Sequence, residues 1–263
     1  MSLCFAAITP HPPLLIPDIG KDKVGQVEQT QKAMQQLEQD IYLSKAELIV
    51  IISPHGGLFE DTFVVNAHSI LHSSFDKFGD LVTKKEWKGA PNLAATLSHE
   101  SHLKNVPLRL VSNEQLDHGT SVPLFYLTDH LPDVKVLPVG FSHLDANSHI
   151  AFGELLKDTI LQQDKRVAVI ASGDLSHRIS DNSPDGYSEH GQKFDDLILQ
   201  LLESKDASGI INIDPDLVQE ASQCGWRSIL ILLGIIKDMD YTFKKYSYEA
   251  PLGVGYLVGN FVF

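Results

Sequence analysis

The uninterrupted apolar run Leu48–Ile52 constrains the fold of this chain more than any other feature of its sequence. A short run without a polar residue is typical of a β-strand that is covered on both of its faces. The segments Val134–Val139 and Val167–Ala171 repeat this buried-strand pattern. Because strands covered on both faces occur in sheets that carry helices on both sides, these three segments predict an α/β fold.

Weaker patterns complete this prediction. Further strands are predicted at Ser2–Thr9, Thr62–Ser69, Leu108–Ser112, Phe243–Tyr248 and Gly253–Val262. Helices are predicted at Lys23–Ala46, Asn92–Leu103, Ser148–Gln162, Ser188–Leu202 and Pro215–Ile236. Strands that alternate with helices predict a single domain over residues 1–263, with a mixed, largely parallel central sheet and helices on both faces.

Composition narrows the class of protein. Of the 263 residues, 43% are hydrophobic, which is enough for one large core, and the formal net charge is −13. An acidic surface argues against nucleic acid as a partner, because phosphate binding requires a basic stripe. The longest apolar runs are too short to span a bilayer, and no secretory signal is recognisable, so a membrane partner is not expected. With two cysteines, Cys4 and Cys224, a disulfide framework is not expected, and we predict a cytoplasmic protein.

Histidines follow three of the predicted strands within a few residues. His11 lies in the proline-rich segment 10–13, His55 precedes a pair of glycines, and His177 follows the strand Val167–Ala171. In open α/β sheets ligands bind beyond the carboxyl ends of strands, so these imidazoles are expected to meet in one pocket. Neutral imidazole is a common metal ligand, and it also serves as an acid or base near neutral pH. A single histidine at the end of a strand is usually an ordinary polar residue. Three histidines that each follow a predicted strand are better explained by a common metal or catalytic site.

Two more residues are candidates for catalysis. Asp174 lies three residues before His177 in a predicted tight turn, and we expect its carboxylate to orient that imidazole. His118 lies in the segment Asp117–Ser121, which is explained almost equally well as the start of a helix.

Glu220 and Cys224 are candidates for a further metal ligand. They are one helical turn apart in the predicted helix, so both are expected on one face of it. A carboxylate beside two histidines favours iron(II), whereas a thiolate favours zinc or copper. A small buried residue is the ordinary explanation of an isolated cysteine.

The order of these motifs resembles that of the class III extradiol ring-cleavage dioxygenase (LigB-like) superfamily, and within it the Memo-like branch. The resemblance covers nearly the whole chain. It consists of Thr9–Pro13, Ser53–Gly57, Asp117–Gly119, Ser172–His177 and Cys224–Ser228.

The resemblance implies a role for each site residue. His11 and His55 are expected as metal ligands, His177 as the catalytic acid or base, and His118 as a second histidine near the substrate. The pair Cys224-Gly225 matches the Memo-like branch, in which the cysteine is a ligand, and Glu220 stays an alternative. Arg227 is expected to bind substrate.

Three functions are consistent with these residues. The first is an iron(II)-dependent extradiol-type dioxygenase that cleaves a small catechol or aminophenol ring with O₂. The second is a Memo-like metal-binding protein with a redox or binding role and no ring cleavage. The third is a zinc-dependent hydrolase, because two histidines and one acid also suit hydrolytic zinc, and Glu249 is the only extra carboxylate considered as its base. Association into a homo-oligomer is left open.

Overall fold

Ten strands form one mixed sheet at the centre of residues 2–263, which are the residues that the computed structural model describes. They are β1 (Leu3–Thr9), β2 (Leu48–Ser53), β3 (Phe63–Asn66), β4 (Ile70–His72), β5 (Glu86–Gly89), β6 (Leu108–Val111), β7 (Lys135–Gly140), β8 (Val167–Ser172), β9 (Thr242–Glu249) and β10 (Tyr256–Val262). Eight of them follow one another in the order β4-β5-β7-β2-β8-β1-β10-β9, and β3 and β6 lie beside the end of β7.

Four parallel strands, in the order β7-β2-β8-β1, form the middle of the sheet. Every residue of β2 and β8 is buried. Thr9 at the end of β1 lies opposite Ser172 at the end of β8, and Ile52 of β2 lies opposite Ala171. Because the strands end in register, the segments that follow β1, β2 and β8 leave the sheet at one edge.

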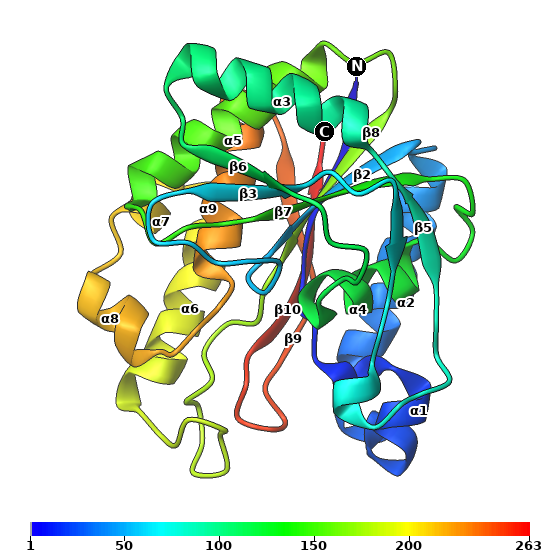
Figure 1. The fold of residues 1–263 in the computed structure, drawn as a ribbon. Coiled ribbons are helices and arrows are strands. Elements are labelled where there is room, and N and C mark those ends of the chain that lie inside the picture. The colour runs from blue at the N-terminus through cyan, green and yellow to red at the C-terminus, as the bar shows by residue number, and fades with distance from the viewer. Residues whose placement is uncertain (1) are drawn as a thin grey trace.

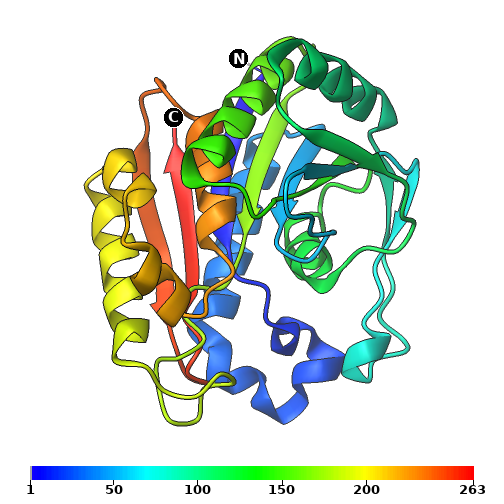
Figure 2. The same ribbon diagram turned by 60° about the vertical axis from the view of Figure 1, so that its left-hand side comes forward.

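Helices cover both faces of this sheet (Figures 1 and 2). They are α1 (Pro17–Gly20), α2 (Glu28–Leu43), α3 (Pro91–Lys104), α4 (His118–Leu127), α5 (Ala146–Leu161), α6 (Glu189–Glu203), α7 (Ala207–Ile211), α8 (Pro215–Glu220) and α9 (Trp226–Ile235). Short 3₁₀ helices occur at Pro13–Leu15 (η1), Lys21–Val27 (η2) and Asp76–Phe78 (η3).

The alternation of side chains along the strands divides the core into two clusters. Val50 and Ile52 of β2 pack with Phe152 of α5 and Ile231 of α9. Ile49 and Ile51 point the other way and pack with the buried residues of α2 and α4, which include Met34, Leu37 and Val122. The α/β fold class predicted from the sequence, with a mixed central sheet and helices on both faces, is therefore confirmed.

The structure differs from the sequence prediction in two places. Strands β4 and β5 were not expected, because they are short and hold polar residues. The helix predicted over Pro215–Ile236 is two helices, α8 and α9, that are separated by residues 221–225. Ser222 has a φ of 49°, a left-handed conformation that cannot continue an α-helix. Within residues 2–263, no helix is both long enough and apolar enough to cross a lipid bilayer.

Candidate metal centre and active site

Histidines 11 and 55 converge at the carboxyl edge of the central strands. His11 follows β1 and His55 follows β2, and their Nε2 atoms are 3.2 Å apart. The Sγ atom of Cys224, which lies just before α9, is 3.7 Å from Nε2 of His11. Two nitrogens that are each about 2.1 Å from one metal ion, at an angle of roughly 90–110°, lie about 3.0–3.4 Å apart. The separation of these two imidazole nitrogens therefore suits two ligands of one ion.

Ser172, the last residue of β8, holds the ring of His11 from behind. The Nδ1 atom of His11 is 3.0 Å from Oγ of Ser172, and the Ser172 hydroxyl donates its hydrogen bond to the carbonyl oxygen of Gly119. The hydroxyl proton is used by Gly119, so Ser172 accepts a hydrogen bond from Nδ1–H of His11. The lone pair of His11 is then on Nε2, which faces His55 and Cys224.

His118 forms the third side of the imidazole cluster. Its ring stacks on that of His55, with centroids 4.3 Å apart and an interplanar angle of 22°. Asp117 is the N-cap of α4, where its Oδ1 accepts from Thr120 N at 2.9 Å and from Ser53 Oγ at 2.6 Å. A Cβ atom on Gly119 would lie 2.6 Å from Oγ of Ser53 and 3.1 Å from Cδ2 of His55, so a larger residue there would displace side chains of the cluster. The segment Asp117–Ser121 is therefore the start of a helix, as one interpretation of the sequence predicted, and it also brings His118 to the other two imidazoles.

Cys224 reaches the cluster because two loops touch. The backbone N of Asp174 donates to Sγ of Cys224 at 3.2 Å, and the backbone N of Cys224 donates to the carbonyl oxygen of Asp174 at 3.2 Å. A Cβ atom on Gly173 would lie 2.2 Å from the Cα of Gly225, so a side chain at Gly173 would force the two loops apart.

Glu220 does not share this position. The break at Ser222 removes the common helical face that the sequence predicted for Glu220 and Cys224. The carboxylate of Glu220 is half-exposed and pairs with Arg178 at 3.1 Å. It lies outside both groups of side chains that could hold a metal ion in residues 2–263, namely His11 with His55 and His118, and His11 with Asp174 and Cys224.

Burial sets the charges of these groups. Burial lowers the pKa of His11 to about 3 and that of His118 to about 4, so both imidazoles are neutral at neutral pH. Burial also raises the pKa of Asp174 to about 6 and raises that of the Cys224 thiol. Neutral imidazoles are ready to bind a cation, and a bound cation would favour the ionised forms of the acid and the thiol. The donor set therefore fits a divalent transition metal.

Asp174 does not occupy the position that was expected for it. Its Oδ1 accepts from the backbone N of His11 at 2.8 Å, and its Oδ2 is 3.9 Å from Nε2 of the same residue. The carboxylate closest to Nδ1 of His177 is that of Asp185, at 3.8 Å. Ser222 donates a hydrogen bond to the same oxygen of Asp185. Asp174 therefore lies against His11, and Asp185 lies beside His177.

His177 leaves one ring nitrogen free. Its Nε2 is buried and has no hydrogen-bond partner within residues 2–263. A charge on His177 would lower the pKa of His11, so the two rings lie within electrostatic reach of each other. Arg227, which was expected to bind substrate, has its guanidinium 5.7 Å from the ring centroid of Phe141 and a buried Nε without a partner among the described residues.

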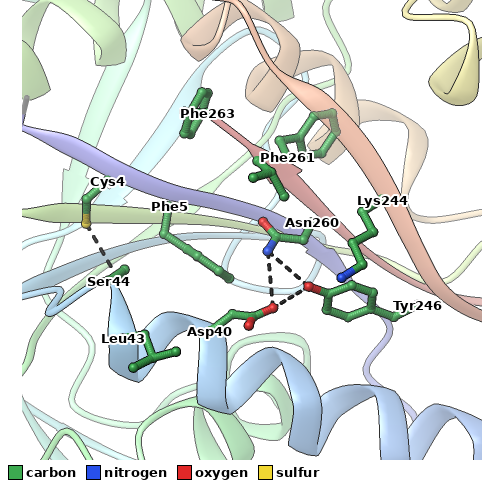
Figure 3. A pocket seen from close by; sticks show the side chains of 11 residues that line it. Cys4, Phe5, Asp40, Leu43, Ser44, Lys244, Tyr246, Asn260, Phe261 and Phe263 are labelled. Atoms are coloured by element: carbon green, nitrogen blue, oxygen red, sulfur yellow. Dashed lines mark hydrogen bonds between the residues drawn. The ribbon is translucent and has the colours of Figure 1, made fainter.

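Two cavities of the structure differ in the polar groups that line them. One of about 520 Å³ is lined by His55 and His118 and continues from the imidazole cluster. Another, of about 410 Å³, lies at the amino end of β1 beside Cys4 (Figure 3). There Asp40 accepts hydrogen bonds from Tyr246 and Asn260, so its carboxylate already has partners. The cavity beside the histidines is therefore the candidate substrate site.

The family model described as "Catalytic LigB subunit of aromatic ring-opening dioxygenase" matches residues 5–259. The chain belongs to the LigB family. The resemblance seen in the sequence motifs is thereby confirmed, and the relatives described next include both dioxygenases and MEMO1 family proteins.

Three proteins with similar sequences have names that indicate different functions or no function. Protein CA_C1420 of Clostridium acetobutylicum is 29% identical over 265 residues, which are 97% of this chain and 57% of that protein. A MEMO1 family protein of Methanosarcina mazei is 27% identical over 124 residues, 47% of this chain and 43% of that protein. A Klebsiella pneumoniae 2,3-dihydroxyphenylpropionate/2,3-dihydroxicinnamic acid 1,2-dioxygenase is 29% identical over 143 residues, 50% of this chain and 44% of that protein. The chain thus spans about half the length of these relatives.

A solved structure shares the fold of this LigB chain. The JW3007 protein of Escherichia coli K12 aligns with a TM-score of 0.70 over 99% of this chain and 100% of its own, at 17% identity. At this level of identity the likeness concerns the fold alone.

The sequence motifs did not point to three residues near the site. Ser172 is the first residue of the motif Ser172–His177, but nothing in that motif gives it a role of its own, and Asp185 lies in a polar loop without a distinctive pattern. Tyr256, at the start of β10, is buried, and burial together with the charges of Asp174, Glu249 and Cys224 raises its pKa. The only local signal for Tyr256 was its position in the predicted C-terminal strand.

Proposed function

We propose that this LigB chain is an extradiol-type dioxygenase, an oxidoreductase that cleaves a small catechol- or aminophenol-like ring with O₂. The observation that carries the proposal is the convergence of His11, His55 and Cys224 beside a cavity lined by His118. Membership of the LigB family supports the reaction class. The relative that is named a dioxygenase acts on a catechol, and we extend that substrate class to this chain as part of the proposal.

In this proposal His11, His55 and Cys224 hold an iron(II) ion, with Asp174 as a neighbouring acid. When bound, the iron would supply the redox chemistry toward O₂ and the orientation of the two ring hydroxyls. Nδ1 of His11, on the far side of the ring from Nε2, donates a hydrogen bond to Ser172. This contact fixes the orientation of the ring.

The protein groups of the site move protons. His177 takes a proton from a substrate hydroxyl on its free Nε2 and returns it later, while Asp185 lies beside Nδ1. His118 is neutral and lines the cavity, so its ring can donate or accept a hydrogen bond at the substrate. Phe78 packs edge-on against His118.

Cys224 is the observation that favours a second function. A thiol in the third position suits zinc or copper better than it suits iron(II). A Memo-like protein that binds metal without ring cleavage is therefore the alternative, and it shares His11 and His55. The zinc hydrolase is less well supported, because Oε1 of Glu249 already accepts two hydrogen bonds from Thr30.

The remaining expectations belong to the same proposal. We propose that residues 1–263 act as a single metal-binding catalytic domain in the cytoplasm, with a small aromatic molecule and O₂ as partners. The acidic net charge of −13 supports a partner other than nucleic acid.

The first test is the metal content of protein purified without added metal and with iron kept reduced. We expect one iron per chain in the wild type and loss of stoichiometric metal in His11→Ala and His55→Ala, with circular dichroism unchanged. Full metal occupancy in His11→Ala would contradict the proposed ligand.

The second test is turnover by the iron(II)-loaded protein. Oxygen uptake and the yellow ring-opened product are followed for a panel of catechols and aminophenols. The variant His177→Gln is expected to keep its metal and to lose roughly 10²–10⁴-fold in turnover, the usual contribution of a positioned proton-transfer group. Failure of the loaded wild type on every compound would favour the Memo-like alternative.

A further inference from the structure

The cavity beside His55 and His118 contains one fixed positive charge. It is lined by His55, Ser74, Lys77, Phe78, Gln115, Leu116, Asp117 and His118, among which Lys77 alone is a lysine or arginine. The volume of about 520 Å³ is in the range of sites for small ligands. The net charge of the chain is −13, so a cation in the lining of this cavity is a distinctive feature of the site.

Lys77 has no carboxylate partner among the residues that the structure describes. The nearby lysines Lys85 and Lys88 form ion pairs with Asp129 and Asp133. Lys77 forms no ion pair of 4.0 Å or less within residues 2–263. The carboxylate of Asp117, which also lines the cavity, accepts hydrogen bonds from Ser53 and Thr120. The ammonium group of Lys77 is therefore free to bind an anion.

The segment that carries Lys77 is held in place. Its two ends are joined by a hydrogen bond from the backbone N of Ser73 to the carbonyl oxygen of Lys85, at 2.9 Å. Oδ1 of Asp80 accepts from the backbone N of Val82 and Thr83, at 2.9 and 3.0 Å. Figure 2 shows the cyan segment of η3 close to α1, and Oγ1 of Thr83 donates to Asp18 there at 3.2 Å. Lys77 is thus presented to the cavity by an ordered turn.

Phe78, the next residue, offers an aromatic surface. Its ring centroid is 5.2 Å from that of His118 at an interplanar angle of 63°, and 39% of the residue is still exposed. An aromatic ligand that reaches the metal ligands past His118 would contact this ring. The cavity thus combines metal ligands, an aromatic wall and a single cation.

We infer that Lys77 is a specificity-determining residue whose ammonium group binds the carboxylate of an acidic catechol while Phe78 contacts its ring. A carboxylate suits this site better than a phosphate, because the lining offers one ammonium and no arginine fork, and the N-terminus of α4 at this cavity is already capped by Asp117. The inference deepens the proposed function and rests on it for the position of the catechol hydroxyls.

The inference is tested by comparing each acid with its uncharged ester. Dihydroxybenzoate, dihydroxyphenylacetate, dihydroxyphenylpropionate and their methyl esters are titrated calorimetrically without O₂, into protein with and without iron(II). For at least one pair the wild type is expected to bind the acid about five- to tenfold more tightly than the ester, the range of an ion pair near the surface. This ratio should fall toward one at high salt.

The variants separate Lys77 from general charge effects. Lys77→Gln should bring the acid-to-ester ratio close to one, and Lys77→Glu should reverse it, whereas Lys84→Gln, an exposed lysine of the same segment, should leave it unchanged. A wild type that binds no acid more tightly than its ester, or a ratio unchanged in Lys77→Glu, overturns the inference.

Admission of O₂ then tests the proposed function separately. Lysine-dependent binding without ring opening would retain the carboxylate site and refute the dioxygenase. Ring opening of acids and esters alike, with Lys77→Gln unaffected, would retain the dioxygenase and refute the carboxylate site.

Discussion

The Nδ1 atom of His11 lies 3.0 Å from Oγ of Ser172, whose hydroxyl donates to the carbonyl oxygen of Gly119. This chain of contacts runs from α4 through β8 to the loop after β1. It selects the His11 tautomer with its lone pair on Nε2, which is the atom that faces His55. In the proposed metal site, a serine that accepts from Nδ1 of His11 would orient this ligand before any ion binds.

Ser172→Ala should weaken metal binding about 10- to 100-fold, because His11 loses the group that fixes its ring and tautomer. Metal affinity is measured by competition with a chelator. Ser228→Ala is the matched control, since Ser228 is equally buried and its hydroxyl has no partner among residues 2–263. Equal affinities of the two variants would contradict the role of Ser172.

Cys224→Ser should lower metal affinity strongly, whereas Glu220→Gln should leave it unchanged. Sγ of Cys224 is 3.7 Å from Nε2 of His11, but the carboxylate of Glu220 pairs with Arg178 outside the cluster. Cobalt(II)-loaded protein provides an independent readout, because a thiolate ligand produces a charge-transfer band that Cys224→Ser abolishes. A band that persists in Cys224→Ser and disappears in Glu220→Gln would reverse the assignment.

Asp185→Asn should reduce turnover about tenfold with little change in KM, because the carboxylate beside Nδ1 of His177 orients the ring. Metal content should stay at the wild-type level, which separates this effect from loss of the ion. Asp181→Asn, in the same loop, is the control, since Asp181 is exposed. A fall in activity that is equal in both variants would indicate a general effect of charge.

Asp195 should make the stability of the fold depend on pH. Its Oδ1 accepts from the backbone N of Ser176 and its Oδ2 from Tyr248, yet burial raises the pKa of its carboxyl group to about 7. Because the folded pKa exceeds the unfolded value of 3.8, the stabilisation is fully present below pH 4 and is lost as pH rises from about 4 to about 7. The loss is on the order of 4 kcal/mol at most.

Urea unfolding of the wild type and of Asp195→Asn at several pH values measures this dependence. The free energy of unfolding of the wild type relative to the variant should fall as pH rises through this window. The comparison cancels the other titrating groups, so parallel pH profiles of the two proteins would show that Asp195 does not titrate there.

Much of the fold could be predicted because its central strands are defined by local sequence. The run Leu48–Ile52 is apolar at every position, and such a segment must be covered on both faces wherever it lies. Val167–Ala171 follows the same rule, and the structure extends it by one residue to Ser172. Polar residues just after such strands are directed to one edge of the sheet, so the meeting of His11 and His55 was predictable as well.

The sequence did not predict the structure of segments in which the hydrophobic pattern is weak or misleading. The hydrophobic spacing of Pro215–Ile236 is helical on both sides of Ser222, so periodicity alone could not reveal the break that separates Glu220 from Cys224. Strands β4 and β5 are only three and four residues long, too short for a recognisable pattern in the sequence. They exist because they pair with each other and because β5 pairs with the start of β7.

Local sequence by itself determined the buried strands, the α/β class and the edge at which the histidines gather, because apolar periodicity reports which faces must be buried. Tertiary structure alone decided the partners of each site residue. The approach of Gly173 to Gly225 brings Cys224 to His11, the loop after His177 returns to place Asp185 beside its ring, and the turn at η3 brings Lys77 to the cavity. These contacts join residues that are distant in the chain or that lie in loops, and packing of the whole sheet and its helices sets their distances.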